Sequence, residues 1–353
     1  GGWIGQLFYD YWLFTGDDDF LGEHAVPFRK EVAAFYEDFL IEKDGRYLFA
    51  PSLSPENSPL VENRSMVCLN ATMDVAIAKE VLQNLCTACR HLKIDPEHVA
   101  KWEEMIGKLP PYEINEDGAL REWLYPGLKD NYHQRHQSHI YPLFPGFEIQ
   151  EEDDKELYDA IAVAVEKRLV IGLNSQSGWS FAHMANIYAR LGNGNRALEC
   201  IELLCRSCMG QNLFTYHNDW RSQGLSLGWF GSSPIFQIDA NFGIAAAIVE
   251  MLVFSRPGLI KLLPALPDKW KTGKAERLQC RGQIEVGLEW DRDSGYFHGT
   301  LVSPKDQTVT VKLPFVPSSF DVKGGEILPS SFGSQYSEIS LHAGIPVELT
   351  LKR

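Results

Sequence analysis

The sequence predicts a mainly α-helical protein with a β module at its C-terminal end. Over about 250 residues, apolar side chains recur at the three- and four-residue spacing of amphipathic helices. After residue 257, short runs alternate apolar with polar residues, and Gly, Pro and Asp separate the runs, as in a β-sandwich. We therefore expect a helical domain over 1–257 and an antiparallel β-sandwich over 258–353.

The helical segments follow one another as antiparallel pairs. We expect helices at residues 3–15, 24–43, 71–92, 96–108, 153–168, 178–192, 194–209 and 240–254, with a strand or turn at 44–50. A toroid of helical hairpins, the (α/α)6 barrel, has this order of elements, but a closed barrel needs six hairpins. The helical segments of this chain are fewer than the twelve helices that six hairpins contain, so we expect an incomplete toroid. The chain has no initiator Met, and we expect the remaining helices upstream of Gly1.

The expected strands of the β module come from its alternating runs. They are Leu278–Leu288, Gly299–Val302, Thr308–Leu313, Ile339–Leu341 and Val347–Leu351. Between the helical part and these strands, the segment 210–234 is rich in Gly and Ser and carries Trp220 and Trp229. A long segment of this kind is typical of a lid, and its aromatic residues favour an ordered one.

Composition excludes some classes of function. The net charge of −14 argues against a nucleic-acid backbone as partner, because phosphates need Lys and Arg. No stretch is long and apolar enough to span a bilayer. The 9 Trp, 13 Tyr and 10 His suit sugar ligands, which have apolar faces and hydroxyl edges, but aromatic residues also fill large cores.

The seven cysteines are scattered, and their odd number argues against a full disulfide framework. Cys86/Cys89 and Cys205/Cys208 have the C-x-x-C spacing of zinc ligands. Both pairs lie in helical patterns, which favours buried thiols over zinc. Reduced thiols favour a cytoplasmic location, with a secreted or periplasmic parent protein as the alternative.

Two carboxylates stand in contexts that suit acid–base chemistry. Asp239 lies where an extended segment turns into a helix, an N-cap position whose free N–H groups keep a carboxylate ionised. It is therefore either a plain cap or a general base. Glu56 lies in the Pro-rich loop 51–63, where three prolines forbid a helix, and is either a solvated surface residue or a functional one.

A third stretch, His133 to Gly146, carries three histidines. His133, His136 and His139 are spaced like metal ligands on one helical turn, but no Glu completes the H-E-x-x-H pattern. A polar pocket wall made of Arg135, His136 and His139 is the other interpretation. We expect no metal and no cofactor.

Four stretches in order resemble family 95 glycoside hydrolases, the inverting α-L-fucosidases, over essentially the whole chain. They are Pro51-Ser52 with Ser54-Pro55-Glu56-Asn57, the run Arg135-His136-Gln137-Ser138-His139, Phe236-Gln237-Ile238-Asp239-Ala240-Asn241-Phe242-Gly243, and Leu262-Leu263-Pro264-Ala265-Leu266-Pro267 before Trp270. The helix starting Gly178-Trp179-Ser180 is similar too. The family usually has His where this chain has Gln134.

The resemblance implies the C-terminal part of an (α/α)6 barrel closed by a β-sandwich. It implies that Glu56 is the general acid and Asp239 the general base, with a water-activating Asn-x-Asn pair upstream of this chain. Such carboxylates lie roughly 6.5–9.5 Å apart, with the acid protonated and the base ionised. Substrate-binding roles are implied for Asn57, Arg135, His136, His139, Trp179 and Asn241.

Three functions follow as hypotheses. The first is removal of terminal α-L-fucose from oligosaccharides or glycans, with an α-L-galactosidase as a close variant. The second is a non-catalytic fragment that needs the missing half of the enzyme as partner or self-associates through exposed apolar helix faces. The third is a metal site at the three histidines.

Overall fold

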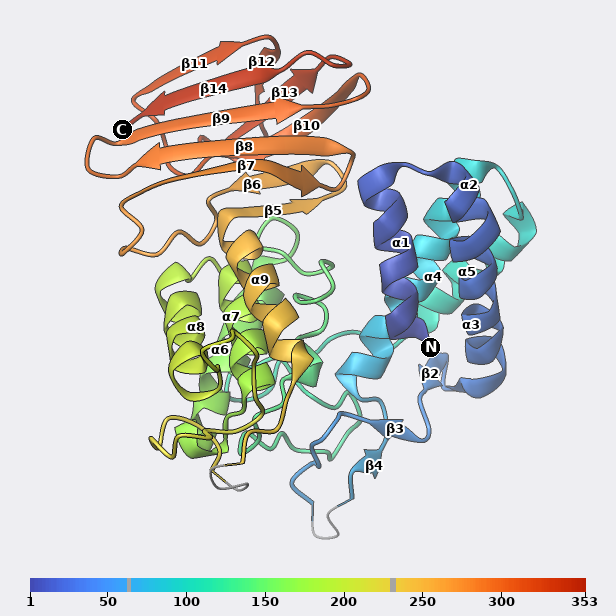
Figure 1. Cartoon of the computed structure of the whole chain (residues 1–353). Coiled ribbons are helices and arrows are strands. Elements are labelled where there is room, and N and C mark those ends of the chain that lie inside the picture. The colour runs from blue at the N-terminus through green and yellow to red at the C-terminus, as the bar shows by residue number, and fades with distance from the viewer. Residues whose placement is uncertain (62–64, 229–232) are drawn as a thin grey trace. The chain divides into compact units, whose positions relative to one another are not determined.

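In the computed structural model of the chain, residues 1–61, 65–228 and 233–353 are described (Figure 1). The chain forms two compact units. The first consists of Gly1–Trp12 and Asp17–Gly172, and the second of Leu13–Gly16 and Leu173–Arg353. Trp229 of the predicted lid lies outside the described residues.

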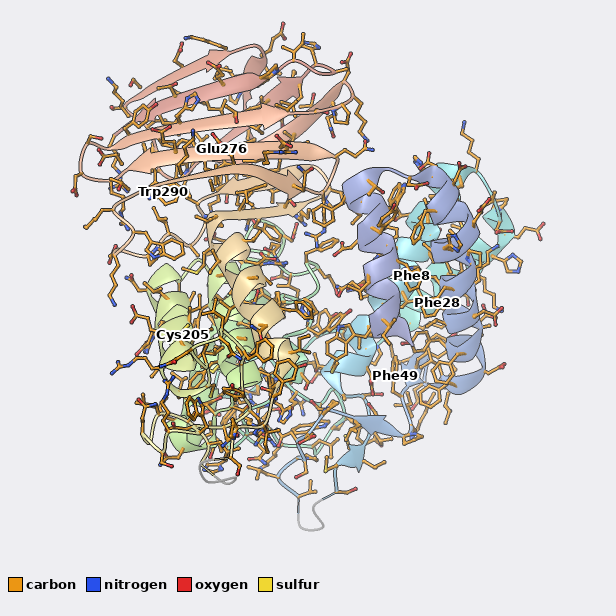
Figure 2. All side chains as sticks on the ribbon, in the orientation of Figure 1. Phe8, Phe28, Phe49, Cys205, Glu276 and Trp290 are labelled. Carbon is orange, nitrogen blue, oxygen red and sulfur yellow. The ribbon has the colours of Figure 1, made fainter. Side chains whose placement is uncertain are left out.

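The first unit is built on helices. They are α1 (Gly2–Thr15), α2 (Asp18–Phe20), the π-helix η1 (Leu21–Ala25), α3 (Val26–Phe39), α4 (Thr72–Leu92), α5 (Pro96–Lys108), the 3₁₀ helices η2 (Ser138–Ile140) and η3 (Leu169–Ile171), and α6 (Lys155–Arg168). α4 packs against both α3 and α5. Phe8 of α1 stacks on Phe28 of α3 with ring centroids 5.2 Å apart (Figure 2).

Sequence signals placed some of these helices well. The predicted break at Asp95-Pro96 is confirmed, because Pro96 opens α5. The prediction of one helix over 24–43 is wrong at its end. α3 stops at Phe39, and Ile41–Lys43 (β1) pairs with Arg46–Leu48 (β2) around Asp44 and Gly45. Both turn residues have positive φ, as a two-residue Asp-Gly hairpin turn requires, and this turn draws the preceding residues into a strand.

The second unit holds η4 (Leu173–Ser175) and three longer helices, α7 (Gly178–Arg190), α8 (Gly194–Ser207) and α9 (Ile238–Leu252). α7 packs against both α8 and α9. α7 and α9 approach each other closely at Gly243 of α9, where an added Cβ would lie 2.7 Å from the Cβ of Ala182 in α7. Within the described ranges, no helix has the length and apolarity needed to cross a membrane.

The end of the chain forms two five-stranded sheets that share one apolar core (Figure 1). One sheet has the order β12-β13-β10-β6-β5 and the other the order β11-β14-β9-β8-β7. All neighbours are antiparallel except β6 and β10, which are parallel. The strands are β5 (Val253–Arg256), β6 (Leu259–Leu262), β7 (Thr272–Cys280), β8 (Ile284–Asp291), β9 (Tyr296–Val302), β10 (Gln307–Lys312), β11 (Ser319–Lys323), β12 (Glu326–Pro329), β13 (Tyr336–Leu341) and β14 (Val347–Lys352).

A mainly helical chain with a β-rich C-terminal part is thus confirmed, although single strands differ. The predicted strand Leu278–Leu288 is wrong, because it spans the end of β7, a turn containing Gly282, and the start of β8. Strands β5, β6, β11 and β12 were not predicted. The boundary at 257/258 falls in the turn between β5 and β6, and as a domain boundary it stays a prediction.

Candidate active site

Glu56 lies in a tight turn of the first unit. The backbone N–H of Asn57 donates to the carbonyl of Ser54 at 2.7 Å, so that Pro55 and Glu56 occupy the centre of the turn. The turn follows strand β3 (Ser52–Leu53), which pairs with β4 (Val67–Cys68). The Ser52 hydroxyl donates to Asp74 in the first turn of α4 at 2.7 Å. The Glu56 side chain itself is 64% exposed, so the turn presents its carboxylate outward.

A buried carboxylate supports the inner side of this turn. Glu122 accepts from the Ser54 hydroxyl at 2.7 Å and from the Asn57 side-chain amide at 2.7 Å. Its charge is balanced by Arg168 of α6, and both side chains are only 2% exposed. Burial raises the pKa of Glu122, while Arg168 and the two hydrogen bonds oppose that rise.

The run from Gln134 to Ser138 holds the outer side. The Gln134 side-chain amide donates to the Glu56 carbonyl at 2.6 Å, and the Ser138 hydroxyl donates to the Pro55 carbonyl. The Gln134 side-chain oxygen accepts from the Arg135 backbone N–H at 2.8 Å and lies 3.1 Å from Nδ1 of His136. Gln134 therefore contacts the backbone of Glu56 directly.

The His136 ring lies close to the Glu56 carboxylate. Its Nε2 lies 3.8 Å from Oε2 of Glu56, which is too long for a hydrogen bond. Burial, helped by the positive charges of Arg135 and Arg168, lowers the pKa of His136 to about 4. The ring is therefore neutral at pH 7.

The remaining predicted pocket residues of this unit differ in exposure. Arg135 is half-buried. His139 is only 2% exposed, and its Nδ1 lies 3.5 Å from Nη2 of Arg168. Asn57 is also 2% exposed, and its amide group bonds to Glu122 and to the Asn131 backbone and side chain. His139 and Asn57 thus belong to the support beneath the turn.

The three histidines do not form a metal cluster. His133 is exposed whereas His139 is buried. Among the residues that the structure describes, no group of three His, Cys, Asp or Glu side chains is placed to hold a metal ion. The seven cysteines are free thiols, and burial raises the pKa of Cys200 and of Cys280 to about 12.

Asp239 lies in the second unit, at the start of α9. The predicted N-cap position is wrong by two residues, because α9 begins at Ile238 and Gln237 is the N-cap. Gln237 has an extended backbone, and its side-chain oxygen accepts from the Trp179 backbone N–H at 2.9 Å. Asp239 therefore lies in the first helical turn, still next to the positive end of the helix dipole, with an exposed side chain.

Asn241 fixes the segment beside the start of α9. Its side-chain oxygen accepts from the Thr215 backbone N–H at 3.1 Å and from the Thr215 hydroxyl at 2.7 Å. Its amide nitrogen donates to the Leu213 carbonyl at 2.8 Å. With Trp179 half-buried at the start of α7, the predicted residues of this unit form one cluster, linked through Gln237.

Sequence reasoning missed Glu122, Arg168 and Gln237. Glu122 stands in the run Ala-Leu-Arg-Glu-Trp-Leu-Tyr at 119–125, where it and Arg121 are the two charged residues among apolar and aromatic ones. A charge in such a run is a signal for a buried, paired group, because unpaired charges are seldom buried. The partner Arg168 is 46 residues away in the chain, and no local pattern indicates it.

Comparison with known proteins identifies the family. The model named "Glycosyl hydrolase family 95 catalytic domain" matches residues 1–252, which is more than half of the chain. The chain belongs to glycoside hydrolase family 95. The model of the family 95 C-terminal domain matches residues 254–342. The resemblance stated from the sequence motifs is thereby confirmed.

Two curated relatives agree with this assignment, and one solved structure has a similar fold. The chain is 36% identical to "Alpha-L-fucosidase 2" of Arabidopsis thaliana over 82% of the chain and 34% of that protein. It is 25% identical to "Probable alpha-fucosidase A" of Aspergillus niger over 83% of the chain and 37% of that protein. The chain thus spans about a third of the length of these curated relatives. It shares its fold with an alpha-L-rhamnosidase of Streptomyces avermitilis, solved with L-rhamnose, at a TM-score of 0.57 and 12% identity over 97% of the chain and 32% of that protein.

Proposed function

We propose that this family 95 chain carries the general acid and the general base of an inverting exo-α-L-fucosidase that acts on fucosylated oligosaccharides or glycans. The observation that carries the proposal is the support of Glu56. Its turn is held from one side by Glu122 and from the other by Gln134 and Ser138, while its side chain stays exposed. A fixed backbone with a free carboxyl group is what proton transfer to a leaving group requires.

The reaction assigns one role to each carboxylate. Glu56 donates its proton to the glycosidic oxygen as the bond to the anomeric carbon breaks. Asp239 takes a proton from a water molecule that attacks the same carbon from the opposite face. The product of an α-L-fucoside is then β-L-fucose, with the configuration inverted. No cofactor or metal takes part in this scheme.

The side chains around both carboxylates suit sugar binding. We assign Arg135 and His136 to the sugar pocket near Glu56, because both lie beside its turn and carry polar atoms. We assign Trp179 to a similar contact near Asp239, because its indole ring is half-exposed. His139, Asn57 and Asn241 act on the sugar through the elements that they hold in place.

The helices belong, in this proposal, to an (α/α)6 barrel completed by upstream parts of the same protein. The exposed apolar face of α1 supports this arrangement: the exposed fractions are 51% for Trp3, 64% for Ile4 and 69% for Leu7. α9 has a similar face, with Phe242 69% and Ile238 48% exposed. Apolar side chains at helical spacing are normally covered by another element.

The same faces favour a second candidate function, a fragment that is inactive until its partner half or a second copy covers them. An α-L-galactosidase is a close variant, since the two sugars differ only at C6. A cytoplasmic location is a further proposal, supported by the seven free thiols.

The test is release of free fucose from 2′-fucosyllactose, with the product anomer read by NMR immediately after cleavage. We expect β-L-fucose from the unaltered chain, and loss of release in both Glu56→Ala and Asp239→Ala. Glu276→Ala is the matched control, because Glu276 is an exposed carboxylate on β7 that pairs with Lys274 (Figure 2). An α-anomer as first product contradicts the inverting scheme. If fucose is released only after the chain is mixed with upstream parts of the protein, the result supports the second candidate, a fragment that is inactive without its partner half.

A further inference from the structure

We infer that Glu122, held by Arg168, is a positioning residue for the general acid, an inference that rests on the proposed role of Glu56. Glu122 does not reach the solvent-exposed side of the turn, since its side chain is 2% exposed. It acts through the two residues that flank the turn centre. Its function is to fix the direction in which the Glu56 side chain leaves the backbone.

The geometry is that of one carboxylate holding both ends of a turn. Oε1 accepts from the hydroxyl of Ser54, the first residue of the turn, and Oε2 accepts from the side chain of Asn57, the last residue. The same turn is closed by the 2.7 Å bond between the Asn57 N–H and the Ser54 carbonyl. Glu56 thus lies between two anchored neighbours.

Arg168 favours the charged form of this carboxylate, against the effect of burial, and holds it in place. One guanidinium nitrogen, Nη2, contacts Oε2 of Glu122, and the other, Nη1, donates to the Asn131 carbonyl at 2.7 Å. Asn131 in turn bonds to Asn57 with its backbone and its side chain. The backbone N–H of Glu122 donates to Asp130 at 2.8 Å, which fixes the position of the residue itself. The buried pair and the turn therefore share one hydrogen-bond network.

A neutral side chain cannot replace this carboxylate without loss. Three donors converge on its two oxygens, from Ser54, Asn57 and Arg168. A glutamine has one acceptor oxygen and places an NH₂ group where a donor already points. In Glu122→Gln, therefore, at least one anchor of the turn weakens and Arg168 loses its counter-charge. In Ser54→Ala one anchor is lost while the ion pair stays.

Two substrates separate positioning of the acid from general damage. 2′-Fucosyllactose has a sugar leaving group that needs a proton, whereas 4-nitrophenyl α-L-fucoside releases a nitrophenolate that leaves without one. We expect Glu122→Gln to lower kcat for 2′-fucosyllactose by about 10²-fold, because misplacement of a catalytic group costs this much. We expect KM to stay within about twofold, and kcat for the nitrophenyl substrate to fall far less.

Ser54→Ala tests the same point with less risk to folding, and we expect a smaller loss of the same selectivity. Glu148→Gln is the matched control, because Glu148 is a partly buried carboxylate of the same unit that pairs with Lys79 and accepts from Tyr112 at 2.7 Å. Glu148→Gln should leave the ratio of the kcat values for the two substrates unchanged. An equal loss of kcat on both substrates in Glu122→Gln and Ser54→Ala overturns the inference.

Hydrogen exchange gives a readout that does not depend on activity. In the full chain, a peptide covering residues 51–58 should exchange faster in Glu122→Gln and in Ser54→Ala, while peptides from α4 and α6 should keep their protection. If the unaltered chain releases no fucose, this measurement decides the inference alone: faster exchange in the turn supports positioning by Glu122, and unchanged exchange overturns it. Failure of the proposed function is read separately, from the unaltered chain.

Discussion

The two candidate carboxylates are held by different chemistry. The turn of Glu56 is supported by a buried ion pair, Glu122 with Arg168. The first turn of α9, which carries Asp239, is supported by neutral amides, those of Gln237 and Asn241. Breaking one half of a buried ion pair leaves an uncompensated charge, whereas losing a neutral hydrogen bond costs much less. The Glu56 region should therefore be the more sensitive to substitution and to pH.

The largest effect should come from removing the buried cation. Arg168→Met leaves the Glu122 carboxylate unpaired, and we expect the free energy of unfolding of the first unit to fall by about 3–5 kcal/mol. Urea denaturation measures this change. Arg196→Met is the control, because Arg196 is 45% exposed and its pair with Glu199 should contribute less than about 0.5 kcal/mol. Similar losses in both variants contradict a special role of the ion pair.

The next largest effect should be a dependence on pH through His136. Its pKa is lowered to about 4 in the folded chain, so the unfolded chain binds more protons as the pH falls below about 6.5. The contribution of His136 to stability is present above that pH and decreases as the pH falls toward 4, by about 2 kcal/mol between pH 7 and pH 5.

The measurement compares His136→Gln with the unaltered chain at both pH values, so that other groups cancel. Glu80 is one such group, because burial raises its pKa to about 7 and its contribution changes with the opposite sign. We expect the stability difference between variant and unaltered chain to shift by about 2 kcal/mol between pH 7 and pH 5. His133→Gln, at an exposed position, is the matched control. A constant difference for His136→Gln rules out the lowered pKa.

The packing of the helix that carries Asp239 gives a third test. In Gly243→Ala the new Cβ would lie 2.7 Å from Ala182, so α9 must move away from α7, at a cost of about 1–3 kcal/mol. Gly107→Ala in α5 meets no atom within 4 Å and should stabilise the chain by about 0.5–1 kcal/mol. In thermal unfolding, Tm should fall for Gly243→Ala and rise for Gly107→Ala. Changes of the same sign in both variants would contradict the close contact.

The smallest effect should come from the neutral amides that support the first turn of α9. Asn241→Ala removes the bonds to Thr215 and Leu213, and we expect a loss of about 1–2 kcal/mol by urea denaturation. Asn195→Ala, whose partner Asp268 is exposed, should lose less. If Asn241→Ala costs as much as Arg168→Met, the contrast between the charged and the neutral support fails.

Local patterns predicted what depends on neighbouring residues. Pro96 opens α5, and the C-terminal part forms sheets, because turn residues and periodicity act over a few positions. The N-cap of α9 was misplaced, because Asp is favoured at that position, whereas Gln237 takes it without a side-chain cap hydrogen bond. The Gln237 side chain instead bonds to Trp179, 58 positions away in the chain. Strand β5 was missed since it continues an apolar helix without any break.

The site residues also fall into those that local sequence patterns predict and those that only contacts between distant segments reveal. Glu56 and Asp239 were chosen from the sequence through their loop and helix contexts and through motifs that resemble a family. The residues that hold Glu56 in place could not be chosen in this way, because Ser54 and Glu122 are 68 positions apart. Contacts between distant segments decide which polar residues are buried, and these contacts produce no periodic pattern in the sequence.

Helix α9 passes into strand β5 without a linker. Val253 donates its N–H to Val249 as the C-cap of the helix and is also the first residue of the strand. The loop after β6 returns to the same place, with the N–H of Leu263 bonded to the Leu252 carbonyl at 2.8 Å. A gene shortened or recombined at this point would leave the end of α9 without its partners. The sheets are therefore a poor module for exchange between enzymes, and protein engineers should transplant α9 together with them.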